Sequence, residues 1–231
     1  MVDIHTHILP CIDDGSQSVD ETLEILAIMA QSGVKKVVAT PHFYSEVTSV
    51  DDFLKRRNEA YEKIKDKKPE EIEVVLGAEV FLDYDLHKAD MRSLAIGDTD
   101  YILIEMPYSR WDPWVFDELF KISAKHNLEI IIAHLDRYVN MIKGEDIQSL
   151  IQMRLKYQAN INFLGSFLRK SNAINLMRNG IIHFVGSDCH NLTSRPPCLA
   201  SSMEKIRARL GEDYVKHYMS NADKMLRNES L

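Results

Sequence analysis

Histidine and carboxylate side chains follow directly after apolar runs at several points of this 231-residue chain. Five fragments show this arrangement: Asp3-Ile4-His5-Thr6-His7, Ala39-Thr40-Pro41-His42, Gly77-Ala78-Glu79, Ala133-His134-Leu135-Asp136-Arg137 and Gly186-Ser187-Asp188-Cys189-His190. A sixth apolar run is followed by Glu105. Imidazole together with carboxylate is a donor set suited to zinc, manganese or iron, and such ions activate water for hydrolysis. The sequence therefore predicts a hydrolytic centre with more than one metal ion.

The spacing within two of these fragments supports metal binding. In a strand, residues i and i+2 share a face, so His5 and His7 can bind one ion together, and Asp188 and His190 repeat the arrangement. A single histidine on an apolar strand is usually a packed core residue. Many ionisable groups at strand ends are harder to explain by packing, because buried charges without partners are costly. The cysteines form no Cys-x-x-Cys pair, which disfavours a structural thiolate zinc site.

Four further histidines lie outside the strand-end fragments, and we expect them to be surface or packing residues. They are His87, His126, His183 and His217.

Short apolar strands that alternate with helices would position the predicted donors. Runs rich in β-branched residues occur at 2–4, 36–39, 73–76, 101–104, 129–133, 159–163 and 181–185. Helical patterns occur at 18–33, 51–65, 114–126, 145–157, 166–179 and 200–210. Ser18 and Glu21 form a capping box at the start of the first helix, and Gly33 ends it. Nearly all-apolar strands that recur at the length of a βα unit predict a parallel sheet covered by helices.

The convergence of the strand ends favours one architecture within the α/β class. Seven strands whose carboxyl ends meet at one set of donors predict a closed or nearly closed barrel, not an open doubly wound sheet. No glycine-rich phosphate loop follows the first strand, which weakens the nucleotide-binding alternative. Since no linker, repeat or low-complexity segment interrupts the pattern, we expect a single domain over residues 1–231.

Composition and charge restrict the classes of partner that this chain could bind. A 45% apolar content fits a globular protein, and a net charge of −7 with a pI near 5.7 argues against nucleic acid or an anionic membrane. No apolar stretch approaches the ~20 residues that span a bilayer, and no signal peptide is visible, so membrane insertion is not expected. Three cysteines, Cys11, Cys189 and Cys198, leave an odd thiol, which fits a reducing cytoplasm.

The order of the fragments resembles that of a known superfamily. The donors His5-x-His7, Pro41-His42, Glu79, Glu105, His134 and Asp188-x-His190 resemble those of the polymerase-and-histidinol-phosphatase (PHP) superfamily of metal-dependent phosphoesterases. Longer matches are Asp3-Ile-His-Thr-His-Ile-Leu-Pro, Ile12-Asp-Asp-Gly15, Ile132-Ala-His-Leu-Asp-Arg-Tyr138, Ser187-Asp-Cys-His-Asn191 and Arg195-Pro-Pro197. They are similar to segments of the manganese-dependent protein-tyrosine phosphatases encoded with bacterial capsular and exopolysaccharide genes. The resemblance covers essentially the whole chain, from Met1 to about Arg227.

The resemblance implies a PHP-type fold, a distorted seven-stranded (β/α) barrel, and three bound metals. Manganese is the expected ion, with iron or zinc as alternatives. The implied ligands of the first metal are His5, His7, Glu79 and Asp188. Glu79 would bridge to a second metal held with Glu105 and His134. His42, His190 and one carboxylate of Asp13-Asp14 would bind the third, and we favour Asp14 over Asp13.

The same resemblance assigns Arg137 and Arg195 to the binding of the substrate phosphate. Arginine suits this role because its planar fork can contact two phosphate oxygens at once. Alternatives are a rim salt bridge for Arg137, for example with Asp136, and a solvated loop position for Arg195. Protonation of the leaving group could come from His42, from Asp188 or from water.

The resemblance implies that the chain is a hydrolase, namely a metal-dependent protein phosphatase that acts on phosphotyrosine. The implied partner, from resemblance alone, is the tyrosine-rich tail of a bacterial tyrosine kinase that controls capsular or exopolysaccharide synthesis. One alternative is a small-molecule phosphoesterase such as a histidinol phosphatase.

Another alternative is a cysteine-dependent phosphatase, since Cys189 and Arg195 satisfy the Cys-x5-Arg spacing. Asp188 beside a thiolate and two prolines after the loop argue against it.

Two further classes of protein are disfavoured. An amidohydrolase would need a carbamylated lysine where Glu79 stands. A non-enzymatic metal-binding or scaffold protein would have little use for two arginines beside a full ligand set.

Overall fold

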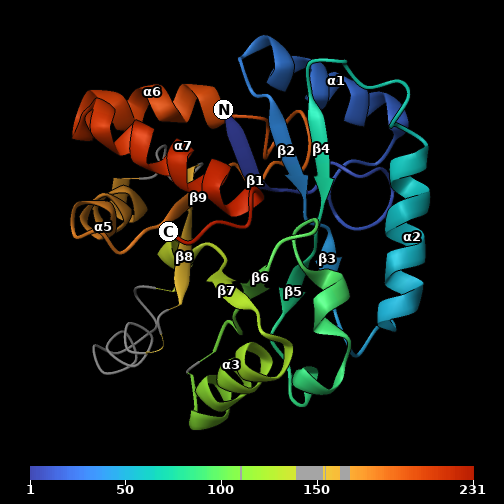
Figure 1. Ribbon diagram of the computed structural model, residues 1–231. Helices are drawn as coiled ribbons and strands as arrows, with labels where there is room; N and C mark the ends of the chain where they lie inside the picture. The colour runs from blue at the N-terminus through green and yellow to red at the C-terminus, as the bar shows by residue number, and fades with distance from the viewer. Residues whose placement is uncertain (110, 139–152, 154, 162–166) are drawn as a thin grey trace.

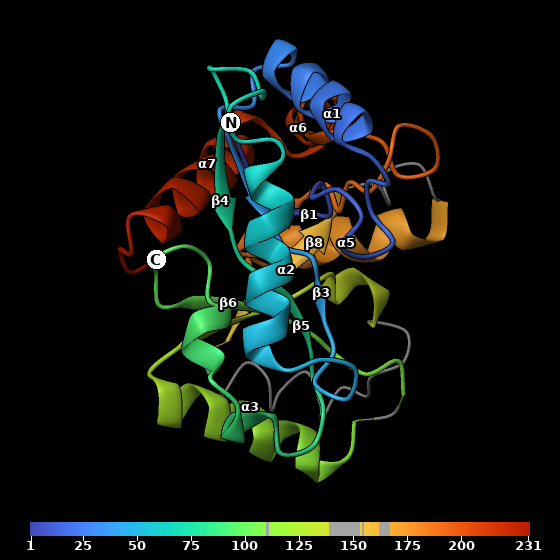
Figure 2. The same ribbon diagram turned by 90° about the vertical axis from the view of Figure 1, so that its right-hand side faces the viewer.

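The computed structural model describes residues 1–109, 111–138, 153, 155–161 and 167–231. A curled parallel sheet forms its centre, and helices cover the outside of the sheet (Figures 1 and 2). The strands are β1 (Val2–Thr6), β2 (Lys36–Ala39), β3 (His42–Phe43), β4 (Glu73–Leu76), β5 (Glu79–Phe81), β6 (Tyr101–Glu105), β7 (Glu129–Ile132), β8 (Lys156–Asn160) and β9 (Phe184–Gly186). The helices are α1 (Val19–Gln31), α2 (Val50–Glu62), α3 (Pro113–His126), α5 (Phe167–Arg178), α6 (Leu199–Leu210) and α7 (Glu212–Leu226). Short 3-10 helices within the described residues include η1 (Leu86–Lys88), η2 (Met91–Leu94) and η3 (Leu135–Arg137).

The nine strands of the described part of the chain occupy seven positions in the sheet, because two positions are filled by interrupted strands. Thr40-Pro41 separates β2 from β3, and Gly77-Ala78 separates β4 from β5. Proline lacks the N–H that a central strand needs, and the Thr40 Oγ1 instead accepts from the Thr6 amide at 3.1 Å. The first halves pair as β1-β2-β4, and the second halves continue as β3-β5-β6-β7-β8-β9, all in parallel.

The two ends of this order meet at β1 and β9. The His7 amide donates to the Cys189 carbonyl at 2.8 Å, and the Asp188 amide donates to the His5 carbonyl at 2.9 Å. A Cβ on Gly186 would lie 2.7 Å from the Cβ of His5, so the close approach requires glycine. These contacts join the last strand to the first and confirm the predicted distorted seven-stranded barrel.

Helix boundaries follow local signals in the chain. Ser18 caps α1 by accepting from the Glu21 amide, although Glu21 returns to the Gln17 amide and not, as in a regular capping box, to that of Ser18. Ser49 caps α2 in the same way. Pro113 occupies the first turn of α3, and Asn127 ends it in the left-handed conformation. No helix in the described part of the chain has the length and apolar character needed to cross a membrane.

Some predicted boundaries were wrong. The strand expected at 159–163 begins earlier, as β8 (Lys156–Asn160), because polar Gln158 and Asn160 interrupt its apolar pattern. The helix expected at 145–157 lies largely outside the described residues, and its last two residues belong to β8. The strand expected at 181–185 is displaced to β9 (Phe184–Gly186), and β3, β5 and α7 were not anticipated.

Two apolar clusters stabilise the barrel. The larger packs the outer faces of strands against the helices. The smaller includes Ile4, Leu103, Ile131 and Phe184, from four different strands, together with Met225 of α7. Tyr101 of β6 contacts Phe184 of β9 edge-on, at 6.4 Å between ring centroids. Because β7 and β8 separate these strands in the sheet, the contact crosses the barrel interior.

Candidate metal centre

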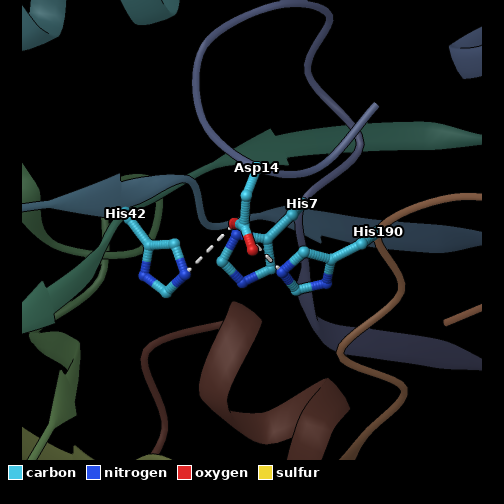
Figure 3. Close-up of side chains that lie close together, drawn as sticks. All are labelled: His7, Asp14, His42 and His190. Atoms are coloured by element: carbon cyan, nitrogen blue, oxygen red, sulfur yellow. Dashed lines mark ion pairs between the residues drawn. The ribbon is translucent and has the colours of Figure 1, made fainter. Parts of the chain in front are cut away.

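The predicted donors lie together near the carboxyl ends of β1, β2, β4, β6, β7 and β9, the side of a barrel of this type that carries its chemistry; His42 and Glu79 follow the breaks after β2 and β4 and begin β3 and β5. Each comes from a strand or from the residues that follow it: His5 and His7 from β1, His42 from β3, Glu79 from β5, Glu105 from β6, His134 after β7, and Asp188 and His190 after β9. Asp14 reaches the same place from the loop after β1 (Figure 3). All nine predicted metal ligands are therefore brought into one cluster.

The first group of donors surrounds a point between His5 and His7. Their Nε2 atoms lie 3.2 Å apart, and Glu79 Oε2 lies 3.1 Å from each of them. Asp188 Oδ1 lies 3.6 Å from the His5 nitrogen and 3.5 Å from that of His7. Two imidazole nitrogens and two carboxylate oxygens thus converge, an arrangement that fits the ligand set predicted for the first metal.

Glu79 connects this group to a second. Its Oε1 lies 2.8 Å from His134 Nε2, which is also 3.5 Å from Glu105 Oε1. The other Glu79 oxygen faces His42 Nδ1 at 3.2 Å, in addition to His5 and His7. One carboxylate therefore faces imidazoles on two sides, which is the geometry expected of a bridging ligand.

A third group lies around Asp14. Its Oδ1 is 3.5 Å from His42 Nε2 and 3.4 Å from His190 Nε2, as Figure 3 shows, and His7 completes the set. Asp13 occupies a different position: its Oδ2 is 2.7 Å from His7 Nδ1 and accepts from the His42 amide at 3.0 Å. Asp13 thus orients a donor from behind, and the geometry favours Asp14 as the ligand.

The loop that carries both aspartates is held close to β1. The Ser16 amide donates to the His7 carbonyl at 3.0 Å, and a Cβ on Gly15 would lie 2.0 Å from that same oxygen. Only glycine fits there, so Asp13 and Asp14 are delivered to the cluster by a turn that the sequence Asp-Asp-Gly makes available.

The donor set fits divalent metal ions. Two buried ring nitrogens that face the cluster, His42 Nδ1 and His190 Nε2, have no hydrogen-bond partner among the described residues, although they lie 3.2 Å and 3.4 Å from oxygens of Glu79 and Asp14. Burial lowers the pKa of His134 and of His190 to about 4, so both rings are neutral near pH 7 and offer a lone pair. Burial and the nearby Glu79 raise the pKa of Glu105 to about 7, because carboxylates in the cluster repel one another. Bound cations would offset this repulsion and satisfy the free nitrogens.

Two polar residues of β8 support the donors, and sequence analysis missed both. Gln158 Oε1 accepts from the His134 amide at 2.7 Å and lies 3.3 Å from His5 Nδ1. Asn160 Nδ2 donates to Asp188 Oδ2 at 2.7 Å. Their i and i+2 spacing on one strand face was the available signal, and it was hidden because the strand was expected to start at residue 159.

The two predicted phosphate-binding arginines lie on the rim of the cluster. Arg137 Nη2 contacts Asp188 Oδ2, while its Nη1 donates to the Tyr108 hydroxyl at 3.1 Å. Arg195 Nη2 donates to Asp14 Oδ2 at 2.7 Å. Their side chains are 24% and 35% exposed, so guanidinium groups beside the ligand carboxylates remain accessible to an anion. The salt bridge considered for Arg137 is thus made with Asp188.

The geometry argues against the cysteine-dependent alternative. Cys189 is fully buried, and burial raises the pKa of its thiol, which disfavours the thiolate that such an enzyme needs. The amides of Thr193, Ser194 and Arg195 all donate to the Asn191 side-chain oxygen. These amides are therefore directed at a side chain and not at a phosphate position.

The four remaining histidines make the packing contacts expected of them. His87 Nδ1 lies 2.7 Å from Glu118, and His126 Nε2 lies 2.9 Å from the His87 carbonyl. His183 accepts from the Tyr157 amide, and His217 contacts Asn221.

Comparison with known proteins adds a family to this geometry. A family model described as "Capsular polysaccharide synthesis, CpsB/CapC" matches residues 1–227. Tyrosine-protein phosphatase YwqE of Bacillus subtilis is 26% identical over 244 residues, which cover 100% of this chain and 93% of YwqE. Tyrosine-protein phosphatase CpsB of Streptococcus agalactiae serotype III is 28% identical over 246 residues, which cover 100% of both chains.

Solved structures share the barrel. One chain comes from a study of YwqE from Bacillus subtilis and CpsB from Streptococcus pneumoniae, described as metal-dependent tyrosine phosphatases. It superposes with a TM-score of 0.85 at 24% identity, over 100% of this chain and 96% of that chain. The phosphotriesterase homology protein of Escherichia coli gives a TM-score of 0.59 at 11% identity, over 96% and 97% of the two chains. At these identities the likeness concerns the fold, and it agrees with the distorted barrel.

Proposed function

Because this chain belongs to the CpsB/CapC family of capsular polysaccharide synthesis, we propose that it is a metal-dependent protein-tyrosine phosphatase. Relatives that match it over its whole length carry that activity in their names. The observation that supports the proposal most directly is the cluster of five imidazoles and four carboxylates with two arginines on its rim. A cationic centre flanked by guanidinium groups suits a dianionic phosphate ester.

We propose the ligand assignment that the resemblance implied. His5, His7, Glu79 and Asp188 would hold one ion, Glu105 and His134 with Glu79 a second, and Asp14, His42 and His190 a third. Manganese is the proposed ion, with iron or zinc as alternatives, because imidazole and carboxylate donors suit all three. When bound, such ions supply Lewis acidity toward the phosphoryl oxygens and a water whose pKa is lowered toward neutrality.

The chain's own residues orient the ester. Arg137 and Arg195 would bind phosphoryl oxygens from two sides of the rim and neutralise charge that grows as water attacks phosphorus. The bond between phosphorus and the tyrosine oxygen breaks, a bond from the water oxygen forms, and a proton must reach the leaving phenolate. A phenol has a pKa of about 10, so this leaving group needs less help than an alcohol would.

The surroundings of His42 and Asp188 bear on how the leaving group is protonated. Asp188 is almost fully buried, and its Oδ2 already accepts from Arg137 and Asn160. The His42 side chain is 16% exposed, whereas those of His5, His7 and His190 are fully buried. We therefore propose that the proton for the leaving phenolate comes from the His42 side of the site, either from the imidazole or from a water beside it.

The proposed biological setting follows from the family. We propose that the whole chain, residues 1–231, works as one catalytic domain in the cytoplasm. The proposed substrate is the phosphotyrosine-bearing tail of a bacterial tyrosine kinase that regulates capsular or exopolysaccharide synthesis.

Turnover measured with metal analysis tests this function. We expect native protein to hydrolyse a phosphotyrosine peptide, to lose that activity after chelation, and to regain it when manganese is added. The same preparation assayed on histidinol phosphate separates the tyrosine phosphatase from the small-molecule alternative. Full activity after complete removal of metal would overturn the metal-dependent function, and preference for histidinol phosphate would overturn the substrate.

A further inference from the structure

Two tyrosine rings stand partly exposed on the rim of the metal centre. Tyr44 follows β3 and is 38% exposed, and Tyr108 follows β6 and is 53% exposed. The Tyr44 ring lies 5.4 Å from that of His42, and the Tyr108 ring lies 6.5 Å from that of His134 in a stacked orientation. Each exposed ring therefore borders a proposed metal ligand directly.

The two tyrosines reach the rim from different strands of the sheet. β5 lies between β3 and β6 in the sheet. Tyr44 follows β3, and Tyr108 lies in the loop after Glu105 of β6. The two tyrosines therefore reach the metal centre from strands on either side of β5.

The orientation of Tyr108 is fixed by two contacts. Its hydroxyl accepts from Arg137 Nη1 at 3.1 Å, and its ring centroid lies 5.2 Å from that of buried Tyr138. In phosphotyrosine a single oxygen joins the phosphorus to the ring. A substrate whose phosphate is bound by Arg137 therefore has its ring within reach of Tyr108.

The Tyr44 side of the rim opens into a cavity. Its volume is about 290 Å³. Its lining is mixed: apolar and aromatic side chains stand beside charged and polar ones, namely Ile12, Asp13, Asp14, His42, Tyr44, Val47, Thr48, Phe53 and Arg56. The apolar part of this lining, next to Tyr44, gives an aromatic group a surface to pack on beside the metal donors.

We propose that Tyr44 and Tyr108 form an aromatic rim that receives the phenyl ring of the substrate and selects aryl over alkyl phosphate monoesters. The inference rests on the proposed phosphatase function and adds to it the residues that give selectivity. Aromatic pairs in offset or edge-on contact gain stability beyond simple burial, and an alkyl group cannot reproduce this.

Selectivity can be measured as the ratio of kcat/KM on phenyl phosphate to that on ethyl phosphate. Tyr108→Leu and Tyr44→Leu should each lower this ratio roughly two- to tenfold, the range expected for one aromatic contact. Tyr108→Phe keeps the ring and should keep the ratio, although loss of the hydroxyl near Arg137 can alter both rates together. Equal losses on the two substrates in both leucine variants would show that the tyrosines have only a structural role.

The matched control is Tyr84, another exposed tyrosine, which follows β5. It is 65% exposed, and its ring stacks on Trp114 at 4.0 Å instead of on an imidazole. Tyr84→Leu should leave the aryl-to-alkyl ratio unchanged. A drop as large as that of Tyr108→Leu would overturn the assignment of selectivity to the rim.

Equilibrium binding separates this inference from the phosphatase function itself. Phenylphosphonate and ethylphosphonate resist hydrolysis, and their affinities for the manganese-loaded protein can be measured by calorimetry. Wild type should prefer phenylphosphonate, and both leucine variants should lose that preference by the same factor as in the kinetics. If no phosphate ester is hydrolysed but this preference is present and lost in the variants, the proposed activity fails and the rim stands. If wild type hydrolyses phosphotyrosine but shows no preference between the phosphonates, the rim fails and the activity stands.

Discussion

At one end of the barrel the strands contribute apolar side chains, and at the other end the same strands contribute imidazoles and carboxylates. β6 shows both: Leu103 joins the inner apolar cluster, and Glu105, two residues later on the same face, joins the metal donors. At the apolar end, the segment after α7 closes the barrel, where the Tyr101 hydroxyl donates to the Glu229 carbonyl at 3.0 Å. Packing stabilises one end, whereas charged groups at the other are tolerated because they face one another and, by proposal, metal ions.

Two residues at the donor end have left-handed backbone. His134 and Asp188 adopt positive φ angles, of 32° and 53°, two residues after β7 and β9 end. Left-handed backbone at a non-glycine residue costs on the order of 1–3 kcal/mol and persists where surrounding contacts enforce it. The hydrogen bonds from the His134 amide to Gln158 and from the Asp188 amide to His5 are such contacts. This backbone strain lowers stability locally and directs the His134 and Asp188 side chains toward the cluster.

The largest expected effect comes from removing donors. His5→Ala, Glu79→Ala and Asp188→Ala should each lower kcat/KM far more than the ~10–100-fold typical of a residue that only orients a ligand. Metal content, measured by mass spectrometry, should fall with activity. The contrasting variant at the apolar end is Leu103→Ala, which should cost about 2–5 kcal/mol of unfolding free energy while the folded protein keeps its metal. Loss of metal from folded Leu103→Ala would contradict the division between the two ends.

The arginine rim should give the next largest effect. Arg137→Ala and Arg195→Ala should lower turnover roughly tenfold to a few hundredfold, since a charge-assisted contact contributes about 1.5–3 kcal/mol. Metal content should stay near the wild-type level, and Arg→Lys should restore activity only in part, because lysine lacks the two-pronged contact. Near-normal kcat/KM on a phosphotyrosine peptide for both alanine variants would mean that other residues bind the phosphate.

Asp13 offers a finer test, because it orients a donor without facing the centre. Asp13→Asn keeps the size of the side chain but weakens its contact with His7 Nδ1, so activity and metal affinity should fall by about 10–100-fold. Asp14→Asn should instead reduce the number of metal ions bound. Titration of both variants with manganese distinguishes the roles, and the reverse pattern would mean that Asp13 is the ligand.

The smallest expected effect is at Cys189. Its side chain is fully buried in the larger apolar cluster, so Cys189→Ala should retain most of the phosphatase activity and metal, with a modest decrease in melting temperature. An inactive but folded variant with full metal content would restore the cysteine mechanism.

The sequence alone was enough to identify the family and to predict a set of donors and arginines that the structure brings together. Strand-end positions could be recognised because parallel strands are short apolar runs, and a histidine or a carboxylate stands at or shortly after the end of each such run. The family and the barrel are confirmed. The missed elements were those without a local signal: β3 and β5 are very short and follow the breaks at Pro41 and Gly77, and β8 has polar residues on its inner face.

Only the tertiary structure decided which of several neighbouring side chains faces the centre of the cluster and which supports it from outside. Asp13 and Asp14 are adjacent in sequence and identical in chemistry, and the turn at Gly15 sends one toward His7 and the other toward His42 and His190. Gln158 became a supporting residue through contacts with His5 and His134, which are far from it in the chain. The pairing of Arg137 with Asp188 and the exposure of Tyr108 arise in the same way. Residue type and local spacing specify which groups can do chemistry, but distances between strands depend on how the barrel closes, and that closure is a property of the whole chain.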